Sequence, residues 1–204
     1  MKQKGMLMVI SGPSATGKST IVKEYLKRNP QIKMSVSATT RQPRPGETDG
    51  VNYFFLNKDV FRKRLENGEF LEHAQVYGNY YGTPKAYVEE QMTDGKDVLL
   101  EIDTEGAMQV REKFAEGVFL FVIPPSLEAL KQRINYRGTE TAAEMNQRLN
   151  NALLEIEQLT QYDYVVMNKH VDDAVGTIES IMLAEKTSVA RCGWYWVHEF
   201  TKQL

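Results

Sequence analysis

The sequence is poor in cysteine. Its single cysteine, Cys192, excludes an internal disulfide, and one thiol cannot make a metal cluster, so we interpret Cys192 as a structural residue. The three histidines, His73, His170 and His198, are scattered and lack the spacing of metal ligands. Composition therefore argues against a disulfide-stabilised scaffold and against a metal-cluster protein.

Long hydrophobic runs are also missing. The apolar stretch at residues 6–10 is far too short for a membrane span or a signal peptide, and no later window reaches membrane length. The net charge is only −2 over 204 residues, so bulk charge indicates neither a nucleic-acid nor a membrane partner. We expect a cytoplasmic protein without nucleic-acid or membrane partners, in which no repeat or long linker divides the chain.

Continuous apolar runs predict the strands of a parallel sheet that is covered on both faces. Four runs are clear and a fifth, at residues 33–37, is weaker; the clear ones are residues 6–11, 97–103, 118–123 and 164–168. Helical patterns separate these runs, and strands that alternate with helices imply a mainly parallel sheet. The sequence therefore predicts an α/β fold.

Two apolar stripes at helical spacing predict helices in the second half of the chain. Thr141 and Glu144 form a capping box before the first stripe. The stripes consist of Leu149, Ala152, Leu153, Ile156 and Leu159, and of Val171, Ala174, Val175, Ile178, Ile181 and Met182.

Residues 39–83 break the alternation of strands and helices. This region is rich in Tyr, Phe, Arg, Gly and Pro, and its strand-like pieces, at residues 52–56 and 70–77, are short. A helix over residues 59–67, ended by Gly68, is expected between them. We predict a smaller inserted unit of mixed helix and strand.

The strongest motif follows the first strand. Residues 12–19, Gly-Pro-Ser-Ala-Thr-Gly-Lys-Ser, match the phosphate-loop pattern G-x-x-x-x-G-K-[ST] at every specified position, and a helix over residues 19–28 follows. Backbone N–H groups of such a loop bind phosphate oxygens, Lys18 reaches the β and γ phosphates, and Ser19 offers a hydroxyl to Mg²⁺. A chance match in a glycine-rich turn would not lie between a strand and a helix. The residues expected to bind ATP are Gly12, Pro13, Ser14, Ala15, Thr16, Gly17, Lys18, Ser19 and Thr20.

A second phosphate site is indicated inside the insertion. Arg41 and Arg44 lie three residues apart in a loop restricted by proline, and both guanidinium groups can form bidentate contacts with one phosphate. A solvated basic turn is the alternative for this segment.

Two acids, Glu101 and Asp103, end the strand at residues 97–103 in alternate positions, so we expect them to point to the same side. Glu101 is a candidate to hold Mg²⁺, partly through water, together with Ser19.

Three stretches resemble the motifs of the guanylate kinase family. They are residues 37–47 (SATTRQPRPGE), 78–83 (GNYYGT) and 101–103 (EID), in the family's order and separation after the phosphate loop. The resemblance extends over residues 7–185. It implies a nucleoside monophosphate kinase that transfers the γ-phosphoryl group of ATP to GMP, giving ADP and GDP with Mg²⁺ as cofactor, in purine nucleotide metabolism. Glu105 departs from the family, where a glutamine is common, and we assign it no role.

The resemblance also implies roles for individual residues. The phosphate of GMP is expected to bind Arg41, Arg44, Tyr53 and Tyr81, and the base to bind Ser37, Glu72, Thr83 and Asp103. The catalytic residues are expected to be Lys18, Arg41, Arg137 and Arg148, the last two on a mobile lid that closes over ATP. Arg133 and Asn168 are weaker candidates for contacts on the ATP side.

The preference for guanine has a chemical reason. Guanine presents N1–H and its amine as adjacent donors to the Glu72 carboxylate, whereas adenine presents an acceptor there. An unpaired buried carboxylate is costly enough for such a site to reject AMP by roughly 10⁴-fold. Taken singly, Tyr53 and Tyr81 remain compatible with packing aromatics, Glu72 with a surface acid and the lid arginines with a helix surface.

Three other functions are weighed against this one. A kinase for another monophosphate would not need Glu72 with Ser37, and an interaction module that has lost catalysis typically has a degraded phosphate loop, whereas Lys18 and Ser19 are present. A regulatory GTPase would need an N-K-x-D segment, which residues 168–171 do not complete.

We predict one three-layer P-loop kinase domain over residues 1–204. Its core comprises residues 1–36, 97–133 and 149–190, an inserted α+β GMP-binding subdomain spans 37–96, and a helical lid spans 134–148. Residues 191–204 form an unusually aromatic tail, for which docking on the core, a subunit contact and poor order all stay open. A homodimer likewise stays open.

Overall fold

The centre of the protein is a five-stranded parallel sheet with strand order β2-β7-β1-β8-β9. The structure is a computed structural model that describes residues 3–76, 78–135 and 142–202. The strands are β1 (Leu7–Ser11), β2 (Lys33–Met34), β7 (Val98–Glu101), β8 (Val118–Ile123) and β9 (Tyr164–Met167). Because all five run in one direction, their carboxyl ends meet at one edge of the sheet, where ligands bind in folds of this kind.

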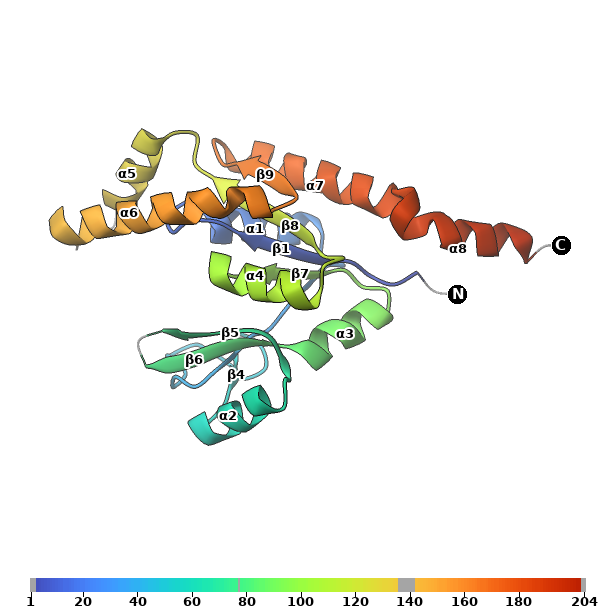
Figure 1. The fold of residues 1–204 in the computed structure, drawn as a ribbon, viewed down its shortest axis with the longest axis horizontal. Helices are drawn as coiled ribbons and strands as arrows, with labels where there is room; N and C mark the ends of the chain where they lie inside the picture. Colours follow the sequence, from blue (N-terminus) through green and yellow to red (C-terminus); the bar gives the residue numbers. More distant parts are fainter. Residues whose placement is uncertain (1–2, 77, 136–141, 203–204) are drawn as a thin grey trace.

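Helices cover both faces of this sheet (Figure 1). On β1, Met8 and Ile10 pack against one helical layer, and Leu7 and Val9 pack against the other, because successive side chains of a strand point to opposite faces. The first layer contains α1 (Lys18–Arg28) and α7 (Val171–Thr187), and the second contains α3 (Lys85–Thr93) and α4 (Thr104–Lys113). The predicted three-layer α/β fold is confirmed.

A smaller sheet of four strands, in the order β4-β3-β6-β5, lies on one side of this core (Figure 1). Phe61 of its helix stacks on Phe70 with ring centroids 4.4 Å apart, and both rings are buried with Ala38. Gly68, with φ of 68°, ends that helix as expected. The elements are β3 (Ala38–Thr39), β4 (Phe54–Phe55), α2 (Lys58–Glu66), β5 (Phe70–Val76) and β6 (Asn79–Pro84).

Two side chains of α4 hold the smaller sheet against the core. The Lys113 amine donates to the backbone carbonyls of Phe70 and Leu71, at 3.1 and 2.8 Å. The Gln109 amide exchanges two hydrogen bonds with the backbone of His73, each 3.0 Å long. These bonds fix the start of β5 relative to the second half of α4.

A pair of helices, α5 (Leu127–Asn135) and α6 (Ala142–Glu157), follows β8. They pack through Leu130, Ile134 and Ala152, and this cluster also contacts Ala15 of the phosphate loop. The short 3-10 helix η1 (Gln158–Gln161) then leads into β9, and α8 (Val189–Thr201) follows α7. Among residues 3–76, 78–135 and 142–202, no helix is both long and apolar enough to cross a bilayer.

Some predicted boundaries were wrong. The strand at 33–37 is only two residues long, because the chain then leaves the central sheet and enters the smaller one at β3. The strand predicted at 97–103 ends at Glu101. Asp103 therefore lies outside the strand, and the two acids are not alternate residues of one strand. Asp103 instead caps α4 by accepting from the Gly106 N–H at 2.7 Å. Thr141 of the predicted capping box lies outside the described residues.

Candidate active site

The phosphate loop connects β1 to α1 at the carboxyl edge of the sheet. Gly12 and Gly17 have φ angles of 135° and 89°, in the left-handed region. A Cβ at Gly12 would lie 2.4 Å from the Val122 carbonyl oxygen, so no other residue fits there without movement of β8. Ala15, at φ 66°, is in the same region although it has a side chain. Its contact with the α5–α6 cluster holds it there.

Two residues that were weaker candidates for contacts on the ATP side hold this loop in place. Arg133 donates to the Thr16 carbonyl and to the Asn168 carbonyl, both at 2.9 Å. The buried Asn168 amide donates to the same Thr16 carbonyl at 2.7 Å. The loop is thus connected to α5 and to the end of β9, a connection that sequence spacing does not reveal.

Lys18 lies folded over the phosphate loop. Its amine donates to the Gly12 carbonyl and, at 2.9 Å, to the Pro13 carbonyl. Burial lowers the pKa of Lys18, and the nearby carboxylates of Glu155, Glu101 and Asp103 oppose that shift. The Lys18 amine therefore lies partly desolvated, with several acids nearby, where the triphosphate is expected.

The first turn of α1 meets the end of β7 at an oxygen-rich position. The Ser19 hydroxyl donates to Glu101 at 2.5 Å, because β7 lies next to β1. A hydroxyl and a carboxylate are hard oxygen ligands, which suit Mg²⁺. Within the described part of the chain, no three His, Cys, Asp or Glu side chains gather closely enough to hold a metal. These two residues therefore fit a Mg²⁺ ion that takes its other ligands from phosphate and water.

Helix α6 brings two charged residues to the phosphate loop. Arg148, a predicted lid arginine, donates to the Ser14 hydroxyl at 3.0 Å. Burial raises the pKa of Glu155, while Lys18 acts in the opposite direction. Sequence reasoning missed Glu155, because a polar residue beside an apolar helical stripe carries no motif. Arg137 lies outside the described residues.

In the smaller sheet, Glu47 organises both predicted phosphate-binding arginines. Its carboxylate accepts two hydrogen bonds of 2.6 Å from the Arg41 guanidinium and one of 2.8 Å from the Arg44 backbone N–H. The hydrogen bonds from Arg41 lower the pKa of Glu47 to about 2. The Arg44 side chain is exposed. Glu47 lies within the arginine motif, but no pattern in the sequence singles it out.

Aromatic rings surround the Arg41 guanidinium. It lies 5.0 Å from the ring centroid of Tyr53 and 5.7 Å from that of Phe55. Tyr81 packs edge-on against Tyr53 at 6.1 Å, and the pairing of β3 with β6 places it there. Tyr53 and Tyr81 thus pack together beside the arginine, and both remain partly exposed.

A second cluster lies where β5 and β6 meet the beginning of α4. Glu72 is 6% exposed and accepts a 2.6 Å hydrogen bond from the Thr83 hydroxyl. A Cβ at Gly106 would lie 3.2 Å from both a Glu72 oxygen and an Asp103 oxygen, so the two carboxylates flank that glycine. Burial raises the pKa of Glu72 to about 7 and Asp103 adds to the shift, whereas the Thr83 hydrogen bond opposes it. Glu72 is thus a buried carboxyl group whose ionised form is costly unless a donor pairs with it.

Ser37, the remaining predicted base contact, lies half-buried just before β3, where its carbonyl accepts from the Phe54 N–H at 2.9 Å. The structure therefore brings Glu72, Thr83 and Asp103 together, and it gathers Arg41, Tyr53 and Tyr81 separately.

Comparisons with known proteins show which proteins this chain is similar to. A family model described as guanylate kinase matches residues 4–185. A guanylate kinase of Clostridioides difficile (strain 630) is 53% identical over 202 residues, which is 99% of this chain and 98% of that protein. One from Caldanaerobacter subterraneus subsp. tengcongensis is 50% identical over 191 residues, with 94% and 93% coverage. The crystal structure of guanylate kinase from Anaplasma phagocytophilum superposes with a TM-score of 0.74 at 34% identity, covering 94% of this chain and 91% of that one.

Proposed function

Since the chain belongs to the guanylate kinase family, we propose that its phosphate loop and its smaller sheet hold the two substrates of one phosphoryl transfer. The chain is an ATP-dependent kinase that phosphorylates GMP, giving ADP and GDP. The observation that carries the choice of acceptor is the buried Glu72 carboxylate, one oxygen of which accepts a hydrogen bond from Thr83.

On the donor side, we assign ATP to residues 12–20. Lys18 already points back over the loop, and it binds the β and γ phosphates by exchanging its carbonyl partners for phosphate oxygens. Arg148 lies within reach of the loop through Ser14, and we propose that it and Arg137 stabilise the charge on the migrating phosphoryl group. Closure over ATP excludes water and limits wasteful hydrolysis.

On the acceptor side, we assign the phosphate of GMP to Arg41, Arg44, Tyr53 and Tyr81. The contact with Glu47 holds Arg41 in one orientation before the substrate arrives, so less entropy is lost when it binds. A phosphate oxygen of GMP is already ionised at neutral pH, so the transfer needs no general base. Positioning of the two substrates in line then supplies most of the acceleration.

We assign Mg²⁺ to Ser19 and Glu101, with part of the coordination through water. When bound, Mg²⁺ neutralises phosphate charge. Ser19 supplies a hydroxyl oxygen, and Glu101 orients that hydroxyl by accepting its hydrogen bond.

The base of GMP is assigned to Ser37, Glu72, Thr83 and Asp103. Glu72 accepts from the guanine N1–H and amine when it is ionised, and the hydrogen bond from Thr83 holds its carboxylate on β5, beside the start of α4. Adenine offers no donor at N1, so AMP would leave a buried charge unpaired.

A coupled assay of ADP release tests the function. It compares GMP, AMP, UMP, CMP and no acceptor, each with ATP and Mg²⁺. We expect turnover with GMP alone. Equal rates with and without acceptor would mean an ATPase, and turnover with a different monophosphate would overturn the assignment of the base site.

Replacing Glu47 by glutamine is expected to raise the KM for GMP about 10-fold with a small change in the KM for ATP, because Arg41 loses its charged partner and its fixed orientation. Steady-state kinetics with each substrate varied measure this, and Glu66→Gln, on the exposed side of α2, is the matched control. An unchanged KM for GMP would show that Glu47 does not position Arg41.

Three further statements remain proposals. They are the division into core, GMP-binding insertion, lid and aromatic tail, a homodimeric state, and a cytoplasmic location. The separate hydrophobic cluster of Ala38, Phe61 and Phe70 supports the insertion as a structural unit.

A further inference from the structure

Strand β5 is irregular in the segment that carries Glu72. Phe70 and His73 are three positions apart on β5, but their partners on β6, Pro84 and Gly82, are only two positions apart. One extra residue in one strand of an antiparallel pair is a β-bulge, which bends the strand and re-aims a side chain. The bulge lies between Phe70 and His73, so it includes Glu72.

The bulge explains why two successive side chains of β5 face the same helix. Leu71 belongs to the same buried cluster as Ala107 and Val110 of α4. The Glu72 carboxylate also lies against α4, because a Cβ at Gly106 would be 3.2 Å from one of its oxygens. Successive residues of a regular strand point to opposite faces. Without the bulge, Glu72 would therefore point away from α4.

Lys113 of α4 bonds to the backbone of the bulge. Its amine donates to the carbonyls of Phe70 and Leu71, at 3.1 and 2.8 Å. Carbonyl groups of successive residues in a regular strand point to opposite edges, so one amine reaches both only where the strand is irregular. The two hydrogen bonds therefore hold the bulged conformation itself.

Gln109 holds the other end of the same segment. It lies one turn before Lys113 on the same side of α4. Its amide donates to the His73 carbonyl and accepts from the His73 N–H, each at 3.0 Å. Strand β5 is the outer strand of its sheet, so these backbone groups lie on an edge that β6 does not cover. The two side chains thus bond to β5 on both sides of Glu72.

We propose that Gln109 and Lys113 are positioning residues for base recognition, which fix the bulge and so hold the Glu72 carboxylate in the acceptor site. The inference rests on the base site assigned to Glu72 above. A β5 that relaxed to a regular register would turn Glu72 to the other face of the strand. The charge of Lys113 acts in the same direction. Burial raises the pKa of Glu72, and the nearby Lys113 opposes that rise.

A double-mutant cycle tests the proposal. Lys113→Met and Gln109→Met keep side chains of similar length without the hydrogen bonds. We expect each to raise the KM for GMP about 10-fold, with the KM for ATP changed by less than about 2-fold. Lys113→Arg keeps the charge and the donors, and it should restore most of the affinity for GMP. In a Glu72→Ala background, Lys113→Met should change the KM for GMP by less than about 2-fold, because the group that it positions is gone.

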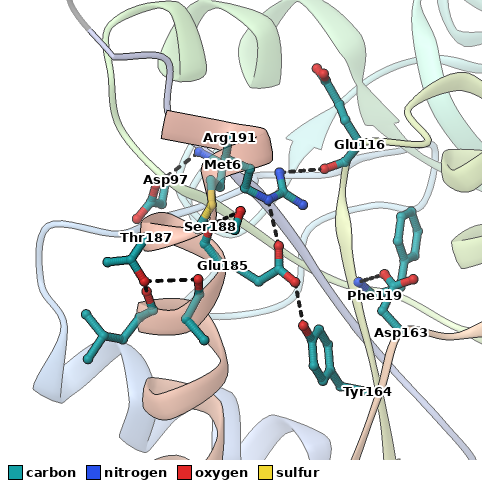
Figure 2. Close-up of polar contacts among 12 residues, drawn as sticks. Met6, Asp97, Glu116, Phe119, Asp163, Tyr164, Glu185, Thr187, Ser188 and Arg191 are labelled. Carbon is teal, nitrogen blue, oxygen red and sulfur yellow. Dashed lines mark hydrogen bonds and ion pairs between the residues drawn. The ribbon is translucent and has the colours of Figure 1, made fainter. Parts of the chain in front are cut away.

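Arg191→Met is the matched control, because Arg191 is also a cation that bonds to a distant backbone carbonyl. Figure 2 shows Arg191 donating to Glu185 of α7, at 2.6 Å, and to the Glu116 carbonyl just before β8, at 2.8 Å. Its replacement should lower the melting temperature, as replacement of Lys113 should, but it should leave the KM for GMP unchanged. The control thus separates a loss of stability from a loss of positioning.

Three outcomes would overturn the inference. The first is an unchanged KM for GMP in both Lys113→Met and Gln109→Met. The second is an equal rise of the KM for ATP, or the same rise of the KM for GMP in Arg191→Met, since either indicates general loosening. The third is a full effect of Lys113→Met in the Glu72→Ala background, because the lysine would then not act through Glu72. Wild-type kinetics in Glu72→Ala alone would instead remove the base site on which the inference rests.

Discussion

Replacing Lys18 by methionine is expected to lower kcat about 10³-fold, the scale of loss for a charge that stabilises a phosphoryl transition state. The Lys18 amine already contacts the loop carbonyls of Gly12 and Pro13, so only a short movement separates it from the phosphates. The KM for GMP should change little, because the acceptor contacts belong to the smaller sheet.

Steady-state kinetics with saturating GMP measure this loss. Lys23→Met, on the exposed side of α1, is the control and should retain wild-type kcat. Burial lowers the pKa of Lys18, so removing this amine should not lower the melting temperature. A loss of kcat under 10-fold in the folded variant would contradict the role given to Lys18.

Replacing Glu72 by glutamine is expected to lower kcat/KM for GMP by roughly 10³-fold and to reduce discrimination against AMP. A glutamine oxygen accepts only one of the two guanine donors well, and its amine faces the other. Glu69→Gln, at an exposed position before β5, is the matched control. Equal GMP kinetics in Glu72→Gln and wild type would remove Glu72 from the base site.

The same substitution should stabilise the empty protein at alkaline pH. Folding raises the pKa of Glu72 from 4.5 to about 7, so its contribution to stability is fully present below pH 4.5 and is lost as pH rises through about 7. Glutamine is neutral at every pH, so the variant does not lose this part of the free energy of unfolding, which is on the order of 3 kcal/mol. Thermal unfolding at about pH 8.5 should show a higher melting temperature for Glu72→Gln, and the difference should shrink at about pH 5. An unchanged difference between the two pH values would contradict the pKa shift.

GMP affinity of the wild-type chain should rise with pH through the same range. Only the ionised Glu72 carboxylate accepts both guanine donors, and its pKa near 7 leaves it largely protonated under mildly acidic conditions. Titration calorimetry at several pH values measures this. A pH-independent affinity between pH 6 and pH 8 would mean that Glu72 is already ionised in the empty site.

Local patterns in the sequence predicted the layers of the fold well. Buried strands of a parallel sheet are continuous apolar runs, so the strands around β1, β7, β8 and β9 were recognisable. The phosphate loop was recognisable because its backbone needs glycine at fixed positions. Strand ends were less accurate, as at Asp103, because a capping carboxylate and a strand-end carboxylate look alike in sequence.

Contacts between segments far apart in the chain account for the site contacts that could not be predicted from the sequence. Arg133, Gln109 and Lys113 hold the two sites in place by bonding to backbone groups far away in the chain, and backbone partners leave no residue pattern. Glu155 reaches the phosphate loop only through the packing of α6. For Glu72 the family resemblance implied the role, but its burial, and with it the pKa, required the structure.

The most direct test of the account is a competition in one tube. The protein receives ATP radiolabelled on its γ-phosphate together with equal concentrations of GMP and AMP, and the labelled products are separated. We predict labelled GDP in excess over labelled ADP by about 10³-fold or more, as the buried carboxylate of Glu72 requires. Comparable labelling of the two products would contradict a guanine-reading site, and label released only as inorganic phosphate would contradict a kinase.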